Sequence, residues 1–341
     1  MRVAINGYGR IGRSILRAFF ERGGPSNLEL VAINELADAR TIAHLTRYDS
    51  THGRFPLALE CRDEQILIAG STIALSHEPD AALCPWRDLE IDLVLECTGV
   101  TGDRQIAQWH ADAGAPRLLF SQPAAADIDA TVVFGVNENS LSAEHSVASA
   151  GSCTTNAVVP VIDVLDRTFG IDCGTITTIH SAMNDQPVLD AYHHNDLRKT
   201  RAASQSIIPI NTQLAKGIDR ILPHLGQRFT AQALRVPTTN VSAIDLTVYV
   251  AQDTTVDAVN SALSVASQSL YGGVLGYTTE PLASCDFNHD PRSSIVDASQ
   301  TSVSGARLVK VLIWFDNEWG YANRMLDVAE YWSTQVQGSS H

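Results

Sequence analysis

Three glycines near the N-terminus constrain the fold of this 341-residue chain more than any other feature. Gly7, Gly9 and Gly12 form the pattern Gly-x-Gly-x-x-Gly between an apolar run, residues 2–6, and a segment of helical spacing, residues 13–22. In this context the first glycine permits a tight turn, the second lets the backbone approach a pyrophosphate, and the third lets helix and strand pack closely. The helix N-terminus would then face the phosphates. The motif therefore predicts a dinucleotide-binding α/β fold.

Apolar runs that fit strands recur through the first 150 residues and alternate with helical patterns. They span residues 2–6, 28–34, 91–98, 118–121 and 131–136. Strands that alternate with helices indicate a doubly wound, mostly parallel sheet. A chain of this length is too long to fold around a single hydrophobic core, so we expect two domains. The first would be an NAD-binding Rossmann domain over residues 1–152.

The pattern changes after residue 152. Helical spacing runs over residues 153–169, and the polar, aperiodic interval 183–210 has the length of a functional loop. Longer strands with period-two alternation are expected at residues 174–181, 229–237, 242–251 and 307–315. We therefore expect an α+β catalytic domain with a mostly antiparallel sheet over residues 153–316, and a C-terminal helix, 317–336, that packs back on the Rossmann domain.

Charge and cysteine usage narrow the function classes. The net charge of −14 at pH 7 opposes binding to nucleic acid or an anionic membrane surface. The six cysteines are scattered without a Cys-x-x-Cys pair, as in reduced cytosolic proteins. No signal peptide or membrane-spanning run is evident. The histidines at 193–194 and the acidic stretch 286–290 lack partners at metal-ligand spacing. We expect a cytoplasmic protein without metal, nucleic-acid or membrane partners.

A cysteine stands where the second helical pattern begins. Cys153 follows Ser152 as a cap, and a helix N-terminus favours a thiolate, the form that attacks an electrophilic carbon. The alternative is a small buried hydrophobe, the state of most free cysteines. His180 ends a predicted strand beside the long loop, where it can serve as a general base, although a lone histidine is more often structural. A nucleophilic cysteine behind a dinucleotide fold suggests oxidation of an aldehyde through a covalent thioester.

Two further sets of charges suggest ligands. Glu35 follows the second strand, 23 residues after Gly12. A carboxylate there accepts from ribose hydroxyls and repels a 2′-phosphate, which favours NAD over NADP; the alternative is a solvated loop acid. A phosphate clamp or a solvated basic patch would explain the cations Arg198, Lys199, Arg201 and Arg235.

Several segments together resemble the glyceraldehyde-3-phosphate dehydrogenase family over essentially the whole chain. They are VAINGYGRIGRSILRA (3–18), ECTGV (96–100), SCTTN (152–156), RAASQSIIP (201–209), RVPTTNVSAIDL (235–246) and WFDNEWGYANRM (314–325). Others resemble the erythrose-4-phosphate dehydrogenase branch of that family: INELADA (33–39), HSAMNDQPVLDAYH (180–193), IIPINTQLAKGI (207–218) and CDFNHDPRSSIVD (285–297).

The resemblance implies roles at matching positions. Cys153 would form the thiohemiacetal and thioester, His180 would take the thiol proton, and Asn317 would fix the nicotinamide carboxamide. The implied substrate-binding residues are Ser152, Thr154, Asp185, Arg198, Lys199, Thr212 and Arg235. The implied NAD-binding residues are Gly7, Gly9, Arg10, Ile11, Gly12, Glu35, Thr98, Gly99, Ser121, Asn317 and Tyr321. The family also implies a homotetramer and a small phosphorylated aldehyde as substrate.

Two departures from the family pattern bear on the reaction. The phosphorylating members that this chain resembles have a threonine at the position of Met183. They have a glycine at the position of Gln213. Both changes would weaken the subsite that binds an anion beside Cys153. A weak subsite for attacking phosphate fits an enzyme whose thioester is hydrolysed by water. We therefore expect oxidation of erythrose 4-phosphate to 4-phosphoerythronate, a step toward pyridoxal 5′-phosphate. The alternatives are a phosphorylating glyceraldehyde-3-phosphate dehydrogenase of glycolysis and a non-catalytic NAD-binding or interaction protein.

Overall fold

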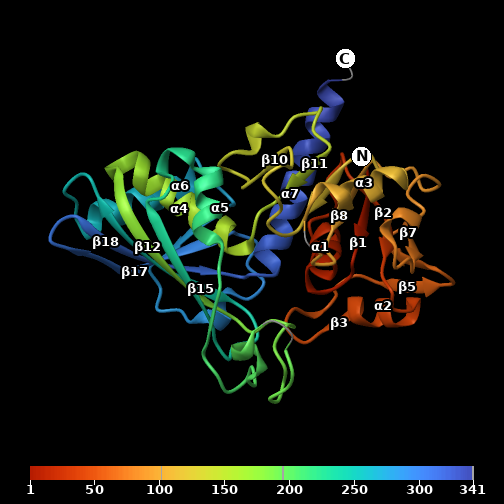
Figure 1. Cartoon of the computed structure of the whole chain (residues 1–341), viewed down its shortest axis with the longest axis horizontal. Helices are drawn as coiled ribbons and strands as arrows, with labels where there is room; N and C mark the ends of the chain where they lie inside the picture. Colours follow the sequence, from red (N-terminus) through yellow and green to blue (C-terminus); the bar gives the residue numbers. More distant parts are fainter. Residues whose placement is uncertain (101, 194–195, 340–341) are drawn as a thin grey trace. The chain divides into compact units, whose positions relative to one another are not determined.

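The computed structural model describes residues 1–100, 102–193 and 196–339. The chain divides into two compact units (Figure 1). The first contains residues 1–152 together with the C-terminal segment from Tyr321, and the second contains residues 153–320.

The first unit is built on a nine-stranded sheet in the order β10-β11-β9-β8-β1-β2-β7-β6-β5. Its strands are β1 (Arg2–Asn6), β2 (Glu29–Asn34), β5 (Leu59–Arg62), β6 (Gln65–Ile68), β7 (Ser71–Ser76), β8 (Leu93–Glu96), β9 (Leu118–Phe120), β10 (Ala130–Thr131) and β11 (Val147–Ser149). Neighbours from β10 to β7 are parallel, and only the β7-β6-β5 edge is antiparallel. The prediction of a doubly wound, mostly parallel sheet is confirmed.

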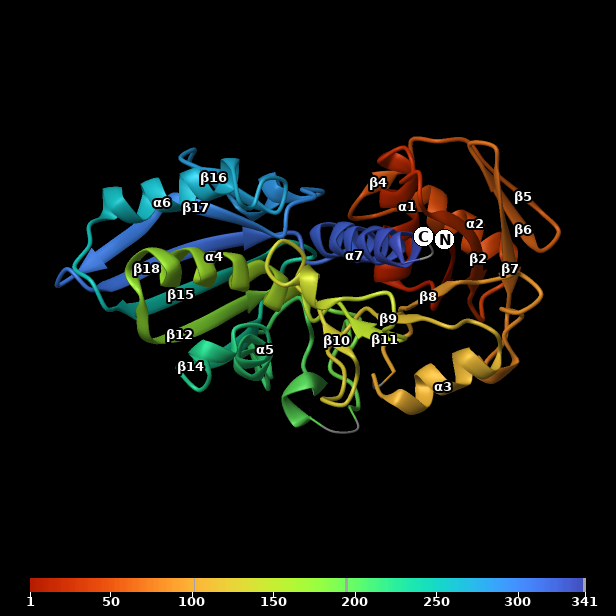
Figure 2. The ribbon, with the colours of Figure 1, turned by 90° about the horizontal axis from the view of Figure 1, so that it is seen from above.

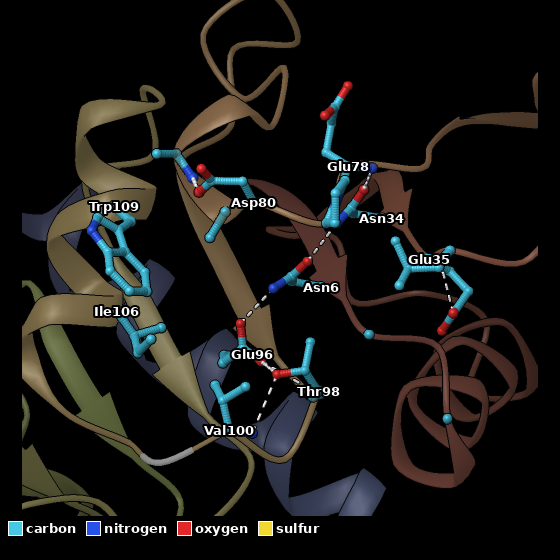
Figure 3. A pocket seen from close by; sticks show the side chains of 17 residues that line it. Asn6, Asn34, Glu35, Glu78, Asp80, Glu96, Thr98, Val100, Ile106 and Trp109 are labelled. Carbon is cyan, nitrogen blue, oxygen red and sulfur yellow. Dashed lines mark hydrogen bonds between the residues drawn. The ribbon is translucent and has the colours of Figure 1, made fainter.

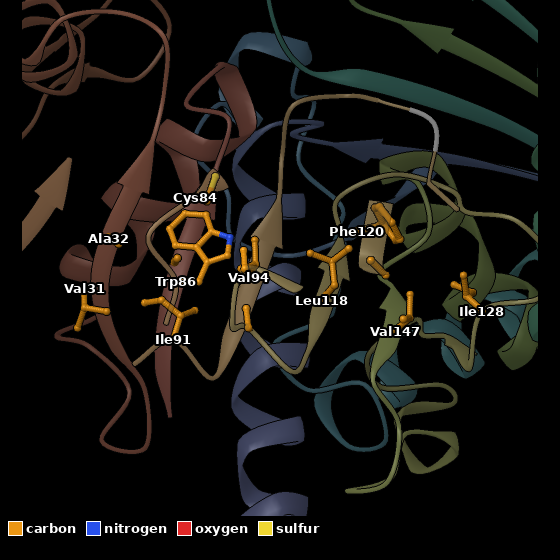
Figure 4. Close-up of a cluster of buried hydrophobic side chains, with 14 residues drawn as sticks. Val31, Ala32, Cys84, Trp86, Ile91, Val94, Leu118, Phe120, Ile128 and Val147 are labelled. Atoms are coloured by element: carbon orange, nitrogen blue, oxygen red, sulfur yellow. The ribbon is translucent and has the colours of Figure 1, made fainter. Parts of the chain in front are cut away.

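Helices and a small hairpin complete this unit. They are α1 (Arg10–Glu21), α2 (Ala39–Arg47), α3 (Arg104–Asp112), the 3-10 turns η1 (Ala81–Leu83) and η2 (Glu138–Ser140), and the hairpin β3 (Tyr48–Asp49) and β4 (Gly53–Arg54). A buried cluster that includes Trp86, Val94, Leu118 and Phe120 forms part of the core (Figure 4). Because both faces of β8 are covered, all four of its residues are buried, which explains the nearly continuous apolar run in the sequence.

One strand prediction in this unit is largely wrong. Only Ala130–Thr131 of the region around residues 131–136 pairs as a strand, β10. Asn137 accepts a hydrogen bond from the Val133 amide (2.7 Å) and donates to the Thr131 carbonyl (2.9 Å). These backbone groups bond to a side chain and not to a neighbouring strand, so the apolar run turns.

The second unit contains a seven-stranded mixed sheet in the order β13-β14-β12-β15-β18-β17-β16. Its strands are β12 (Ile171–His180), β13 (Ile208–Ile210), β14 (Phe229–Arg235), β15 (Ser242–Val250), β16 (Leu275–Thr278), β17 (Ser294–Ser304) and β18 (Leu308–Phe315). Neighbours are antiparallel except for the parallel pairs β12–β14 and β16–β17. The predicted mostly antiparallel sheet is therefore confirmed.

Helices lie against this sheet. They are α4 (Cys153–Phe169), α5 (Leu214–Ile221) and α6 (Val256–Gln268), with 3-10 turns η3 (Leu197–Thr200), η4 (Pro223–Leu225) and η5 (Ser284–Phe287). The helices α4 and α6 pack side by side on one face (Figure 1, Figure 2). As predicted, α4 starts at Cys153. Gly170 follows it in a left-handed conformation, φ +68°.

The last helix, α7 (Trp319–Gly338), belongs to the first unit from Tyr321 onward. Three contacts fix it there. Arg22 donates to Asp327 (2.7 Å), Asn27 donates to the Glu330 carbonyl (2.9 Å), and the Trp332 indole donates to the Ser142 carbonyl (3.0 Å). Among the described residues no helix combines the length and apolar character needed to cross a membrane.

Candidate active site

The glycine loop between β1 and α1 has the geometry expected for a nucleotide. A Cβ on Gly7 (φ +88°) would fall 2.6 Å from the Thr98 amide nitrogen, and one on Gly12 would fall 2.2 Å from the Gly7 carbonyl. Both positions therefore require glycine. A Cβ on Gly9 would meet no described atom within 4 Å. The backbone at Gly9 is thus open to a ligand, and the residues present fit the diphosphate of NAD.

A cavity of about 750 Å³ lies beside this loop, at the carboxyl ends of β1, β2 and β8 (Figure 3). Its lining includes the carboxylates Glu35, Glu78 and Glu96 and the apolar side chains of Ile106 and Trp109. Ligands of open α/β sheets bind at these strand ends. An apolar wall with carboxylates suits an adenosine, which offers a flat base and hydroxyl donors.

Glu35 is held rigidly at the edge of this cavity. Its two carboxylate oxygens accept from the backbone amides of Tyr8 and Leu36, each at 2.8 Å. A carboxylate fixed in this way has lone pairs left for ribose hydroxyls and opposes a 2′-phosphate.

The other predicted cofactor residues lie around the same strand ends or are engaged by protein groups. Thr98 lines the cavity, Gly99 follows it in the chain, and Ser121 follows β9, with its amide bonded to the Glu96 carbonyl (3.0 Å). Ile11 lies in the first turn of α1, and Arg10 forms an ion pair with Asp49. The buried Tyr321 hydroxyl donates to the Gly151 carbonyl (2.8 Å).

In the second unit, the predicted nucleophile and base are in contact. Cys153 is the first residue of α4, and His180 is the last residue of β12. Cys153 Sγ lies 3.7 Å from His180 Nε2, and the imidazole is 6% exposed. Phe315 meets the imidazole edge-on, with ring centroids 6.3 Å apart. Cys153 Sγ and His180 Nε2 are therefore within the distance of a sulfur–nitrogen hydrogen bond.

Parallel pairing brings a third predicted residue to the same place. His180 and Arg235 are register partners at the ends of β12 and β14. Arg235 Nη1 lies 2.7 Å from His180 Nδ1, and that nitrogen also lies 2.8 Å from the Ser181 carbonyl oxygen. Because a guanidinium only donates, Nδ1 is the acceptor of the first contact. Arg235 is 7% exposed, and its Nε has no partner within the described part of the chain.

Burial and the nearby cation set the protonation of the pair. Burial together with the charge of Arg235 lowers the pKa of His180 to about 4. Burial raises the pKa of Cys153 to about 11, although Arg235 and the Thr154 amide oppose this. The amides at the helix N-terminus favour the thiolate, as expected, but burial outweighs them. At neutral pH the pair is a thiol beside a neutral imidazole.

Asn317 is oriented by two hydroxyls. Its Oδ1 accepts from Ser181 Oγ (2.9 Å) and from Ser242 Oγ (2.8 Å), and both serines are fully buried. Ser242 Oγ in turn accepts from the Ser181 amide (3.0 Å), so its hydrogen is committed to Asn317. This arrangement leaves the amide nitrogen of Asn317 available to donate to a carboxamide oxygen.

The remaining predicted substrate residues divide into two sets. Lys199 pairs with Asp185 at 2.6 Å, and Arg198 is exposed. Thr154 lies in the first turn of α4 and follows Ser152 by two residues, and Thr212 precedes α5 by two residues. These two helices pack closely, since a Cβ on Gly217 would meet the Thr155 hydroxyl at 3.1 Å. The first turn of α4 therefore lies against the middle of α5.

Ser181, Ser242 and the buried carboxylate Glu96 are site residues that the sequence did not predict. Two sequence signals point to Glu96, since it is an acid at the end of an apolar strand and it begins the segment ECTGV (96–100). Among residues 1–100, 102–193 and 196–339, no group of three or more His, Cys, Asp or Glu side chains could hold a metal ion. His194, named above with His193, lies outside the described residues.

The fold and the cofactor cavity define a nicotinamide-dependent dehydrogenase. The family model described as the NAD binding domain of glyceraldehyde 3-phosphate dehydrogenase matches residues 1–104. The model described as the C-terminal domain of the same enzyme matches residues 152–317. The chain therefore belongs to the glyceraldehyde 3-phosphate dehydrogenase family. It is an NAD-dependent oxidoreductase that acts on an aldehyde group, and enzymes of this family bind a small phosphorylated aldehyde.

Proposed function

We propose that the protein oxidises D-erythrose 4-phosphate to 4-phosphoerythronate with NAD, and that water opens the cysteine thioester. The observation that supports this proposal most strongly is that Met183 and Gln213 depart from the pattern of the phosphorylating members of the family. The Met183 side chain is 46% exposed at the start of the long loop and offers no hydroxyl. Gln213 is exposed and occupies the cap position of α5. Each lost hydrogen bond to an anion costs about 1.5–3 kcal/mol, which weakens the subsite for attacking phosphate.

Cys153 and His180 would carry the chemistry. The thiol attacks the aldehyde carbon while its proton passes to His180 Nε2, 3.7 Å away. Because both groups are neutral at pH 7, attack and proton transfer occur together without a resting thiolate. His180 returns the thiol proton to the oxygen of the adduct, which completes the thiohemiacetal. The hydrogen on the former aldehyde carbon would then leave as hydride to bound NAD, while His180 takes the hydroxyl proton and later releases it to solvent. His180 finally assists water in opening the thioester.

Arg235 would link substrate binding to the base. While it donates to Nδ1 of His180, the ring hydrogen lies on Nε2, which then cannot accept the thiol proton. An anionic phosphate attracts the guanidinium more strongly than a neutral nitrogen does. Once Arg235 turns to the substrate phosphate, Nδ1 carries the hydrogen and donates to the Ser181 carbonyl, 2.8 Å away. Nε2 is then free to act as the base.

Three of the features described above would hold the cofactor. The glycine loop would take the diphosphate, Glu35 the adenosine ribose, and the oriented amide of Asn317 the nicotinamide carboxamide. The carboxylate of Glu35 favours NAD over NADP.

The long loop supports a homotetramer. Large apolar side chains in it are exposed, namely Val188 (81%), Leu189 (73%), Tyr192 (81%), Leu197 (85%) and Ile207 (66%). Such an exposed apolar set is typical of a protein interface. Light scattering coupled to gel filtration would give a mass of four chains. The six free cysteines suit a reducing cytoplasm, where the product would serve pyridoxal 5′-phosphate synthesis.

Steady-state kinetics with two aldehydes tests the proposal. NADH formation is followed with erythrose 4-phosphate and with glyceraldehyde 3-phosphate, each with and without inorganic phosphate. We expect a higher kcat/KM for erythrose 4-phosphate and turnover without phosphate. A strict need for phosphate, together with preference for glyceraldehyde 3-phosphate, would identify the glycolytic enzyme. No NADH from either aldehyde would indicate a non-catalytic NAD-binding protein.

A further inference from the structure

A buried carboxylate, Glu96, lines the cofactor cavity, and Figure 3 shows its contacts with Asn6 and Thr98. It accepts four hydrogen bonds in all. Glu96, the last residue of β8, is fully buried. Its Oε2 accepts from Asn6 Nδ2 (2.6 Å) and from His110 Nε2 (3.1 Å). Its Oε1 accepts from the Thr98 amide (2.8 Å) and from the Thr98 hydroxyl. Four donors match the four lone-pair positions of a carboxylate.

The direction of these bonds is fixed by an indole. Trp86 Nε1 lies 2.8 Å from His110 Nδ1, and an indole nitrogen only donates. His110 Nδ1 is therefore an acceptor, and the ring hydrogen lies on Nε2, pointing at Glu96. His110 and Trp86 are both fully buried, so this tautomer has no competing water partner.

Glu96 stays ionised in this setting. Burial alone would raise the pKa of Glu96, but the hydrogen bonds from His110, Thr98 and Asn6 lower it below its ordinary value. A proton on either oxygen would face an N–H or O–H donor. The carboxylate therefore imposes one direction on every neighbouring hydrogen bond.

That direction decides what Thr98 offers to a ligand. Thr98 lines the cavity, whereas its hydroxyl hydrogen is committed to Glu96. The Val100 amide also donates to this hydroxyl oxygen (3.4 Å), so one lone pair of the oxygen remains for the cavity. The Asn6 amide is fixed in the same way, because its oxygen accepts from Asn34 (2.8 Å) while its nitrogen donates to Glu96.

We propose that Glu96 is a positioning residue that makes Thr98 a fixed acceptor in the cofactor cavity. The cavity then selects hydrogen-bond donors of the adenosine half of NAD, its ribose hydroxyls or adenine amino group, over acceptor-only phosphate. The inference rests on NAD binding and is independent of the aldehyde that the enzyme oxidises.

Isothermal titration with NAD and with ADP-ribose, without aldehyde, tests this assignment on two variants of Thr98. Thr98→Val removes the hydroxyl, and Thr98→Ser keeps it. We expect Thr98→Val to raise Kd for both ligands by the same factor, about 3- to 10-fold, the effect of one hydrogen bond. Thr98→Ser should restore affinity to within about 2-fold. In turnover, KM for NAD should rise in Thr98→Val while kcat at saturating NAD stays within about 2-fold.

Glu96→Gln provides the second test. It replaces one acceptor oxygen with an NH₂ group that must face two donors. We expect a rise in Kd of about 10- to 100-fold, as for loss of hydrogen bonds to a charged group, with kcat at saturation again retained. If Glu96→Gln does not fold, the comparison of Thr98→Val with Thr98→Ser still tests the proposal.

Three results would overturn the proposal. These are unchanged affinity in Thr98→Val, equal losses in Thr98→Val and Thr98→Ser, and unchanged affinity in folded Glu96→Gln. Because these titrations contain no aldehyde, they stand whether or not erythrose 4-phosphate proves to be the substrate.

Discussion

Two buried histidines, one in each unit, occupy opposite electrostatic surroundings. His110 lies beside the carboxylate of Glu96, and each of its ring nitrogens has a strong partner. His180 lies beside the guanidinium of Arg235, and its Nε2 faces the sulfur of Cys153 at 3.7 Å. Burial alone therefore does not identify a reactive histidine.

The difference shows what makes a histidine available for chemistry. A ring held at both nitrogens by strong partners keeps one tautomer and orients its neighbours. A ring with one nitrogen facing a weakly bonding thiol, beside a cation that lowers its pKa, stays neutral. Such a ring can accept a proton at that nitrogen once the cation releases the other one. The predictions below test this contrast.

The largest expected effect is at the nucleophile. Cys153→Ala should abolish turnover, because no other group can form the thioester, and NAD binding in the absence of aldehyde should stay within about 2-fold. Cys173→Ala, at an exposed position, is the matched control and should retain full activity. The account fails if Cys153→Ala keeps more than a few per cent of activity.

The next effect separates the two histidines directly. His180→Asn should slow hydride transfer, seen as the NADH burst in stopped flow, by about 10²–10⁴-fold, as for loss of a general base. His110→Asn should weaken NAD binding and lower thermal stability but leave the burst rate at saturating NAD within about 3-fold. Equal burst rates in the two variants would remove the distinction.

Acid should destabilise the protein through His180. Its pKa is about 4 in the folded protein and 6.5 in an unstructured chain, so between these values the unfolded chain binds a proton that the folded protein does not. The free energy of unfolding should therefore fall as pH drops from 6.5 to 4, by about 3 kcal/mol from this group. In urea titrations over this range, His180→Asn should show a shallower pH dependence than the unmodified protein. An unchanged slope would contradict the lowered pKa.

A smaller effect concerns the cofactor side. Glu35→Ser should narrow the preference for NAD over NADP by roughly 10-fold, mainly by raising KM for NAD, because a charge-assisted acceptor is lost. The ratio of kcat/KM for the two cofactors measures this. Equal use of NADP by the unmodified enzyme would show that Glu35 does not face the ribose.

Sequence patterns predicted the sheets better than the polar contacts. The glycine motif and the apolar runs identified β1, β2 and α1, because local spacing decides them. The run at residues 131–136 failed, because Asn137 diverts its backbone bonds. The hydrogen bond between Ser181 and Asn317 could not be predicted from the sequence, because it depends on which distant segments the sheet register brings together. The raised pKa of Cys153 was missed for a related reason, since burial is a property of the folded environment and not of the helix start.

Oxygen labelling tests most directly the claim that water opens the thioester. The enzyme is turned over with erythrose 4-phosphate and NAD in phosphate-free buffer made with ¹⁸O-water, and the product is analysed by mass spectrometry. In a parallel sample without enzyme, the aldehyde oxygen exchanges with ¹⁸O-water through the hydrate. The label gained in this control is subtracted from the label found in the product. The account predicts NADH formation and 4-phosphoerythronate that carries one further ¹⁸O atom in its carboxylate. No NADH until phosphate is added, followed by accumulation of an acyl phosphate, would contradict it.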